Sequence, residues 1–291
     1  MILVLFLCFG INAFPSCPPA MRIYPNKKLN PEVCLRQGHS GDSVAKVEII
    51  LYFCKQIQEE MKYPEYEKAF SPARLNRYLI ACNGNSTKAL ILYRHNIKLC
   101  QKFYDILNIF EIVLRNTINN HYCATFRDTQ WIEHQLQPGG MLEKAPQKNE
   151  VLLIIEKLRK RDKYSNDRVV SSVSFGFWTH LFTREPFRLG GQNLLRIFPN
   201  RTAGLGQRAI FNELMEIKTF RNRIAHHEPI CFGENNEIDI SSTKEKYELI
   251  LKYIGFLGYQ SYHLFYGIDI LPESTIAKID ALKHSKQKIT I

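Results

Sequence analysis

Apolar residues recur with helical periodicity along most of the chain. The longest periodic segment is Thr87–Phe126, in which spacings of three and four separate the apolar residues Phe103, Leu107, Phe110, Leu114 and Ile118. This segment is expected to form either one long helix or two helices in tandem with a break near Arg94–Asn96. No stretch alternates between apolar and polar residues over a convincing length, so we expect an all-α protein.

Residues that favour helix ends predict where other helices begin and stop. Ser71 and Pro72 suit the N-cap and the first position of a helix. The Asn-Gly-Asn sequence at 83–85 is typical of the turn that ends it. Periodic apolar residues predict further helices at Val47–Met61 and Asn149–Lys163.

Two more helices are predicted near the C-terminus. The capping-box pattern Ser242–Glu245 begins a helix that runs to about Tyr266. Leu271–Ser274 begins a short last helix, followed by a lysine-bearing tail. We therefore divide the chain into an apolar leader (1–20), a lead-in with one helix (21–70), a main helical domain (71–270) and a short helix with its tail (271–291).

The most informative helix is predicted at Gln207–Glu228, because Pro229 cannot continue it. One arc of about 100° on its surface holds an ordinary core-facing stripe, made of Ile210, Leu214, Ile217, Ile224 and Ala225. Arg221 falls in the middle of that arc, and an arginine is costly to bury unless a carboxylate or a phosphate meets it. His226 lies about 140° round the helix and about 7.5 Å further along the axis. Both side chains are long enough to converge on one ligand at the helix edge, particularly if a second helix or subunit closes the site.

The partner that we expect for Arg221 lies in the long periodic segment. Glu111 and Arg115 stand four residues apart at the border of its apolar stripe, in the order that favours an ion pair within a helix. Glu111 is therefore the first candidate partner of Arg221. Asn116 follows Arg115, and we group it with them as a residue that orients Arg221 or lines a groove.

Two further segments have unusual compositions. Thr183–Arg208 is mostly irregular by pattern and carries five arginines against one acid, which favours phosphate contacts over a merely solvated loop; the arginines are Arg184, Arg188, Arg196, Arg201 and Arg208. Val169–Phe182 contains an aromatic cluster with little charge, so we expect it to pack in the core rather than to stack on bases.

The overall charge points to a polyanionic partner. Lysine and arginine number 39 against 28 acidic residues, a net charge of +11, and nucleic acid comes before an anionic membrane as an explanation. The eight cysteines form no Cys-x-x-Cys pair, which indicates neither a zinc site nor a disulfide framework. No cofactor-binding or phosphate-loop motif is present, so we expect no metal and no cofactor.

The N-terminus leaves three alternatives open. Residues 2–9 are continuously apolar but too short to span a membrane, and no basic residue precedes them. They are an extension outside the working protein, with Met21 as the true start, or an export signal, or a packed element. The first alternative agrees with a reducing, cytoplasmic location and no membrane partner.

Four blocks in order resemble a known family. They are SPARLNRYL (71–79), FEIVLRNTINN (110–120), SFGFWTHLF (174–182) and RNRIAHHEP (221–229). The last resembles the R-x4-6-H signature of HEPN domains, and the set is similar to the Abi-like (abortive infection) branch of bacterial phage-defence proteins. The resemblance covers about residues 47–270.

The resemblance implies a HEPN-like helical bundle, here with additional N-terminal helices, that acts as a homodimer. Active members of the family are metal-independent endoribonucleases. The motif pair is then Arg221 and His226, Asn222 is the polar residue after the arginine, and His227 can assist. An antitoxin or a phage-derived trigger is implied as a further partner.

Two other interpretations remain beside the nuclease. The protein can be a non-catalytic module that binds RNA through the arginines of Thr183–Arg208, or Arg221 can be only a buried partner of Glu111. A second motif match, Arg115 to His121, has the spacing R-x5-H. Because His121 falls on the apolar stripe of its own helix, we interpret it as a core or interface histidine.

Overall fold

The structure is a computed structural model that describes residues 61–269 and 272–284. The apolar leader and the predicted helix Val47–Met61 lie outside the described residues, apart from Met61. Contact density divides the chain at Lys62 into two units, and only the second, Tyr63–Ile291, is described below. Its secondary structure is helical, and a single β-bridge between Phe232 and Ile238 is the only strand pairing within the described residues.

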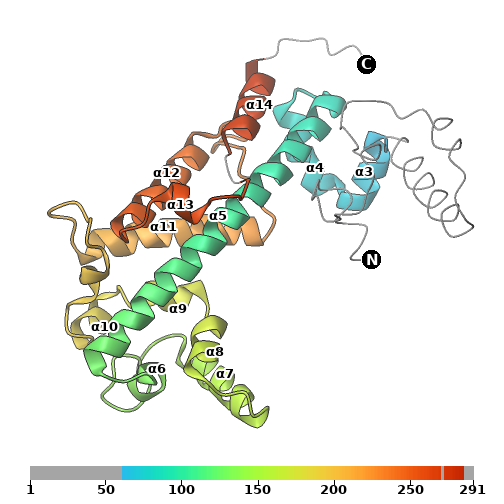
Figure 1. Cartoon of the computed structure of the whole chain (residues 1–291). Helices are drawn as coiled ribbons and strands as arrows, with labels where there is room; N and C mark the ends of the chain where they lie inside the picture. The colour runs from blue at the N-terminus through green and yellow to red at the C-terminus, as the bar shows by residue number, and fades with distance from the viewer. Residues whose placement is uncertain (1–60, 270–271, 285–291) are drawn as a thin grey trace, which may run out of the picture. The chain divides into compact units, whose positions relative to one another are not determined.

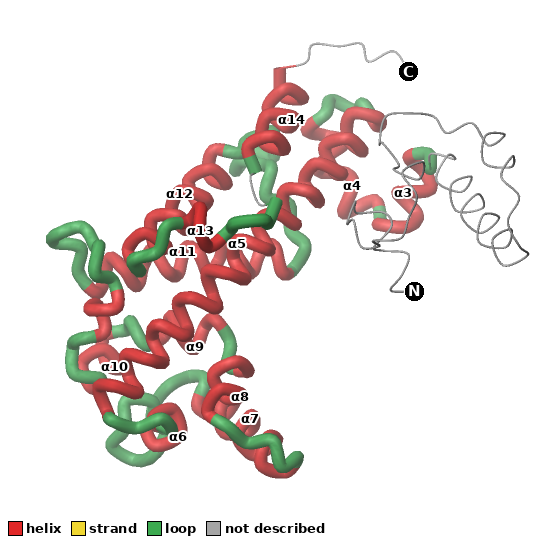
Figure 2. Tube along the Cα trace, viewed as in Figure 1, coloured by secondary structure: helices red, strands yellow, loops and turns green. Residues whose placement is uncertain are grey.

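The helices follow one another in the order that Figures 1 and 2 show. The first half holds α3 (Tyr63–Phe70), α4 (Pro72–Ala81), α5 (Ser86–Phe126), α6 (Trp131–Gln135), α7 (Lys148–Lys160), α8 (Asn166–Ser172) and α9 (Phe175–His180). The second half holds α10 (Arg184–Leu189), the 3-10 helix η3 (Leu194–Ile197), α11 (Gln207–Ala225), α12 (Ser241–Phe256), α13 (Ser261–Leu264) and α14 (Glu273–His284). The expectation of an all-α protein is confirmed.

Helix α5 is the element against which most others pack. It is one unbroken helix of 41 residues, about 60 Å long, which decides between the two alternatives for this segment. Asn85 caps its start by accepting a hydrogen bond from the backbone N–H of Lys88 at 2.9 Å, and Arg127 ends it in the left-handed conformation. Helices α3, α4, α6, α8, α9, α11, α12, α14 and η3 all contact it.

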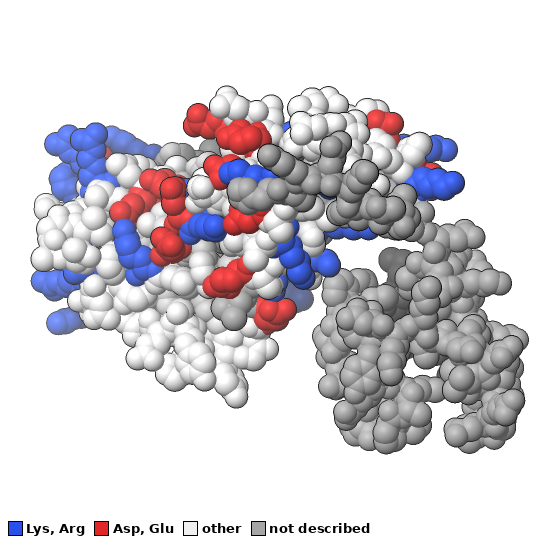
Figure 3. All heavy atoms as spheres, turned by 90° about the horizontal axis from the view of Figure 1, so that it is seen from above, with Lys and Arg blue, Asp and Glu red and all other residues white. Residues whose placement is uncertain are grey.

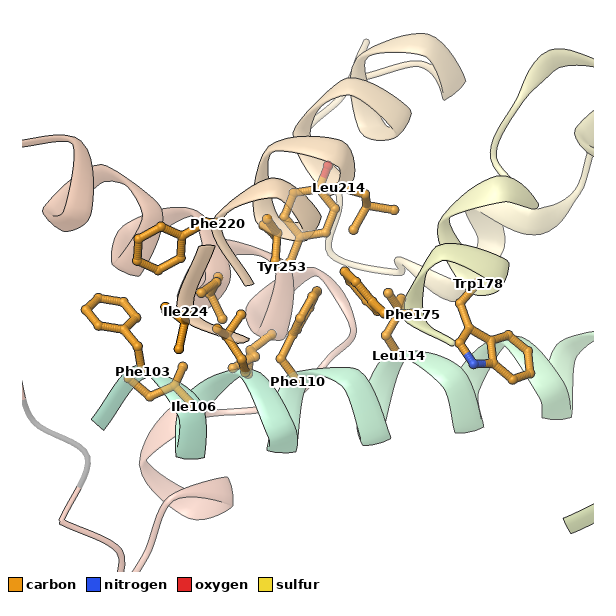
Figure 4. Close-up of a cluster of buried hydrophobic side chains, with 14 of the residues drawn as sticks. Phe103, Ile106, Phe110, Leu114, Phe175, Trp178, Leu214, Phe220, Ile224 and Tyr253 are labelled. Atoms are coloured by element: carbon orange, nitrogen blue, oxygen red, sulfur yellow. The ribbon is translucent and has the colours of Figure 1, made fainter. Parts of the chain in front are cut away.

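The core lies along the apolar stripe of α5. Phe103, Phe110 and Leu114 are completely buried, and Figure 4 shows them pointing toward side chains of α9, α11 and α12, among them Phe175, Trp178, Leu214, Phe220, Ile224 and Tyr253. The aromatic residues of the block 174–182 are buried, so their predicted packing in the core is confirmed.

The cysteines of the described residues are free thiols. Cys82 and Cys231 are buried, and Cys100 and Cys123 are half-buried. Burial raises the pKa of the Cys100 thiol to about 11. The thiol therefore stays protonated near neutral pH, as expected of a small apolar core residue.

Two predicted helix starts differ from the structure. Ser71 precedes α4, but its side chain accepts no capping hydrogen bond from the helix; its φ is 76°, and its own N–H donates to Glu67 O at 2.9 Å. Helix α3, which the sequence analysis missed, therefore runs almost directly into α4. Helix α12 begins at Ser241 rather than at a Ser242 cap, since Asp239 Oδ1 accepts from both N and Oγ of Ser241.

Other predicted boundaries were wrong because local turns interrupt the periodicity. Helix α12 ends at Phe256 and not near Tyr266, because Gly258 adopts a φ of 87° that closes the helix. The arginine-rich segment Thr183–Arg208, predicted to be mostly irregular, contains α10 and η3.

Candidate active site at the end of helix α11

The predicted motif helix ends earlier than its sequence suggests. Helix α11 stops at Ala225, with His226 as C-cap and His227 in the left-handed conformation at φ 58°. His227 N donates to Ile224 O at 3.0 Å and Glu228 N donates to Arg223 O at 2.8 Å, the two bonds of a Schellman turn. Ending the helix there exposes Ala225, which the sequence analysis had placed in the core stripe.

The predicted contact between Arg221 and Glu111 is present. Arg221 Nε lies 2.7 Å from Glu111 Oε1, and the two side chains are 40% and 24% exposed. The arginine is therefore at the edge of the core and not sealed in it. Because the bond uses Nε alone, the two terminal nitrogens of the guanidinium have no partner among the described residues and remain as donors for an anion.

The other residues of the motif follow Arg221 along the chain and differ in their exposure to solvent. His226 and His227 are exposed, and Asn222 is half-buried. Neither imidazole makes a side-chain hydrogen bond to any described residue, which leaves the ring nitrogens of His226 open to solvent or to a ligand. The end of α11 thus presents a fixed cation and an unengaged imidazole five residues apart.

Long-range hydrogen bonds hold the turn that carries the histidines. Arg74 of α4 donates from Nη2 to His227 O at 2.5 Å, and Arg223 donates from Nη2 to Pro229 O at 2.6 Å. Both cations bind carbonyl oxygens of the turn that follows α11, close to the helix C-terminus, where the helix dipole favours positive charge. Arg74 belongs to the first sequence block, but its role was not predicted from the sequence.

Buried polar residues fix the chain just after the turn. Asn96 of α5, only 4% exposed, accepts the backbone N–H of Ile230 at 2.9 Å. Thr243 of α12 donates to Ile230 O at 2.5 Å. The sequence carried a signal for Asn96, because it is a polar residue on the apolar stripe between Leu92 and Leu99.

Arg115 and Asn116, which were also predicted to support Arg221, make no hydrogen bond to it. Arg115 is half-buried, and its Nε is buried without a hydrogen-bond partner within the described residues. Asn116 is exposed and its side chain makes no hydrogen bond to a described residue. His121 is half-buried and its Nε2 lies 2.8 Å from Asn193 Oδ1, which agrees with the structural role predicted for it.

Lys218 lies one helical turn before Arg221 and close to His180, and neither residue was predicted. Lys218 precedes Arg221 by three residues, so both project from the same face of α11. A Cβ atom at Gly176 of α9 would lie 3.4 Å from Lys218 Nζ, which places the lysine over the start of α9. Burial, together with Lys218, lowers the pKa of His180, so His180 is neutral near pH 7.

The four sequence blocks meet in the structure. Arg74 of the first block binds the backbone of the fourth, and Glu111 of the second pairs with Arg221 of the fourth. The rings of Phe110 and Phe175 join the second block to the third, with their centroids 6.2 Å apart. Residues that are far apart in the sequence therefore form one continuous region around the end of α11.

The five arginines of Thr183–Arg208 have different surroundings. Arg184, Arg196 and Arg208 are exposed and form no ion pair with a described residue. Arg188 pairs with Glu185 at 3.3 Å on the surface. Arg201 is half-buried and donates from Nη1 to Leu195 O at 2.8 Å. Figure 3 shows basic side chains gathered at the left edge of one face and mixed with acidic ones in its middle.

Across residues 61–269 and 272–284, no three His, Cys, Asp or Glu side chains cluster so as to hold a metal ion. None of the helices in the same residues combines the length and the apolar character needed to cross a bilayer.

Comparisons of the chain with protein-family models, with curated proteins and with solved structures found no match.

Proposed function

We propose that this protein is a HEPN-type endoribonuclease of the Abi-like kind, which cleaves cellular or phage RNA during phage infection. The observation that carries the proposal is the geometry of Arg221. Glu111 holds its Nε at 2.7 Å and leaves both terminal nitrogens unbound, and the exposed His226 follows five residues later at the end of the same helix. The meeting of the four blocks around this point supports the resemblance that the sequence suggested.

The proposed reaction uses the RNA itself as the nucleophile. The neutral imidazole of His226 takes the proton of a 2′-hydroxyl, and the 2′-oxygen attacks the adjacent phosphorus. The bond from phosphorus to the 5′-oxygen breaks, which leaves a 2′,3′-cyclic phosphate, and the 5′-oxygen takes a proton from an imidazolium. Since no water molecule has to be activated for this step, a metal ion is not needed.

Arg221 supplies the second requirement, which is a fixed positive charge. Its guanidinium would donate to the non-bridging oxygens of the scissile phosphate as negative charge builds up in the transition state. Glu111 restrains the side chain before RNA binds, so little further ordering is needed. A homodimer would bring two such pairs together, and one imidazole then serves as base while the other serves as acid.

The test uses the purified full chain and end-labelled single-stranded RNA. Arg221→Ala and His226→Ala should each lower the cleavage rate by about 10²–10³-fold, while Arg161→Ala and His263→Ala, which alter exposed residues away from the motif, should leave it unchanged. Circular dichroism checks that all four variants fold. Cleavage by the first two at the rate of the unaltered protein would refute the catalytic assignment.

A second candidate function is RNA binding without cleavage. It is favoured by the exposed and unpaired Arg184, Arg196 and Arg208. The same experiment separates the two functions. Fragments that end in a 2′,3′-cyclic phosphate support the nuclease, whereas a mobility shift with intact RNA supports a binding or sensing module that acts in a defence or toxin–antitoxin system.

A further inference from the structure

The segment between α10 and α11 lines an open hollow of about 520 Å³. It lies around η3, and its lining includes Gln192, Asn193, Arg196, Pro199 and Arg201. This volume falls within the range of small-molecule sites, about 300–1,000 Å³. The hollow is separate from the end of α11. Its lining residue Asn193 contacts His121 of α5, and His121 lies ten residues, or about 15 Å, along that helix from Glu111, the partner of Arg221.

The charge of the hollow is positive and uncompensated. Arg196 and Arg201 line it, and no acidic residue does. Arg196 is exposed and makes no ion pair with a described residue, while Arg201 uses only Nη1, on Leu195 O. The Nη2 of Arg201 has no hydrogen-bond partner among the described residues and is left as a donor for a ligand.

A neutral donor completes the lining. His121 Nε2 lies 2.8 Å from Asn193 Oδ1, which occupies the amide oxygen and leaves Asn193 Nδ2 without a described partner. The wall beneath is stiff, because Phe198 is buried and its ring packs against Tyr253 with centroids 5.6 Å apart. Two guanidiniums and one amide donor on a rigid support suit the oxygen atoms of a phosphate group.

We propose that this hollow, named here the Arg196–Arg201 hollow, binds the phosphate group of a nucleotide. Of the five arginines of Thr183–Arg208 that were predicted to bind RNA, the proposal assigns phosphate binding to Arg196 and Arg201 alone. It rests on the proposed function only for the idea that the natural ligand is RNA. The phosphate has two possible sources, a free nucleotide or a phosphodiester within an RNA strand, and the same chemistry recognises both.

The experiment measures binding to the full chain by calorimetry and fluorescence anisotropy. The probes are adenosine 5′-monophosphate and a fluorescent RNA with 2′-O-methyl groups, which cannot be cleaved through its 2′-oxygen. Arg196→Ala should weaken binding of at least one probe by about tenfold. The matched control Arg188→Ala removes the same charge from the same segment, where Glu185 already neutralises it, and should change binding by less than about twofold.

Arg201 is tested with lysine rather than alanine, since its bond to Leu195 O also supports the loop. Arg201→Lys should weaken binding of the same probe, because the single nitrogen of a lysine replaces a guanidinium whose Nη1 holds Leu195 O while its Nη2 stays free for a phosphate. A loss confined to the RNA probe identifies a strand as the source, and a loss for both probes identifies a site for single nucleotides. The proposal is overturned if neither probe binds, or if Arg196→Ala leaves the binding of both probes unchanged.

This test is independent of the nuclease proposal. Arg221→Ala should lower cleavage of ordinary RNA by about 10²–10³-fold without changing binding of adenosine 5′-monophosphate. Arg196→Ala should weaken binding of at least one of the two probes, in a measurement in which no RNA is cleaved. Failure of one pattern with success of the other therefore shows which of the two proposals is wrong.

Discussion

The hydrogen bond from Ile230 to Asn96 offers the sharpest test of how the turn after α11 is held. Asn96→Leu keeps the size of the side chain but removes the acceptor for the Ile230 N–H, which is otherwise unpaired within the described residues. Ile230 is 2% exposed, so water cannot replace the lost partner. A buried N–H left without a partner costs about 1–3 kcal/mol.

Thr243→Val tests the other side of the same residue. It removes the donor to Ile230 O and should cost about 0.5–1.5 kcal/mol, less than Asn96→Leu, because a carbonyl oxygen without its partner is less costly than an orphaned N–H. Since both bonds end on Ile230, the double variant should lose less stability than the sum of the two single losses.

The measurement is urea unfolding of the full chain followed by circular dichroism, with Asn108→Leu as the control. Asn108 lies on α5 as well but is exposed, so its replacement should change the free energy of unfolding by less than about 0.5 kcal/mol. If Asn96→Leu proves as stable as this control, the Ile230 N–H finds another partner and the turn is not fixed by α5.

Three other predictions concern the motif and its surroundings. His227→Gly should stabilise the protein by about 0.5–1 kcal/mol in urea unfolding, because glycine adopts the left-handed φ without strain; a loss of stability would mean that the imidazole contributes to packing. Glu111→Gln keeps an acceptor for Arg221 and should cost less than about 1 kcal/mol, while Glu111→Lys should cost clearly more; equal unfolding midpoints would contradict the ion pair. Burial and neighbouring lysines lower the pKa of His180 and His95 below their ordinary value of 6.5. The unfolded chain therefore takes up these protons first, so stability is full above about pH 6.5 and declines as the pH falls. His180→Gln should flatten that decline between about pH 7 and pH 5, and an unchanged slope would show that His180 is not the group responsible.

Much of the local structure follows from the sequence because it depends on short-range preferences. The spacing of apolar residues determined the all-α architecture and the buried face of α5. The pairing of Arg221 with Glu111 was predictable because both lie at or near the apolar stripe of their own helices, although the structure places Arg221 at the edge of the core, with 40% of its side chain exposed, and not in the middle of the buried face. These inferences need only the period of the helix and the cost of burying a charge.

The boundaries and the precise form of the site depended on contacts between distant segments. Whether α5 is one helix or two was open because Asn96 is a polar residue in its apolar stripe. The helix continues through it since Ile230, 134 positions away, provides the hydrogen bond that makes its burial tolerable.

The same dependence explains why the turn after α11 was not foreseen. Pro229 predicted where the helix had to stop, but the helix ends at Ala225 because His227 takes the left-handed conformation of a Schellman turn. Arg74, which is 153 positions away, binds the carbonyl of that residue. Periodicity carries no information on such pairings, because the free energy that selects them is gained only once the helices have packed.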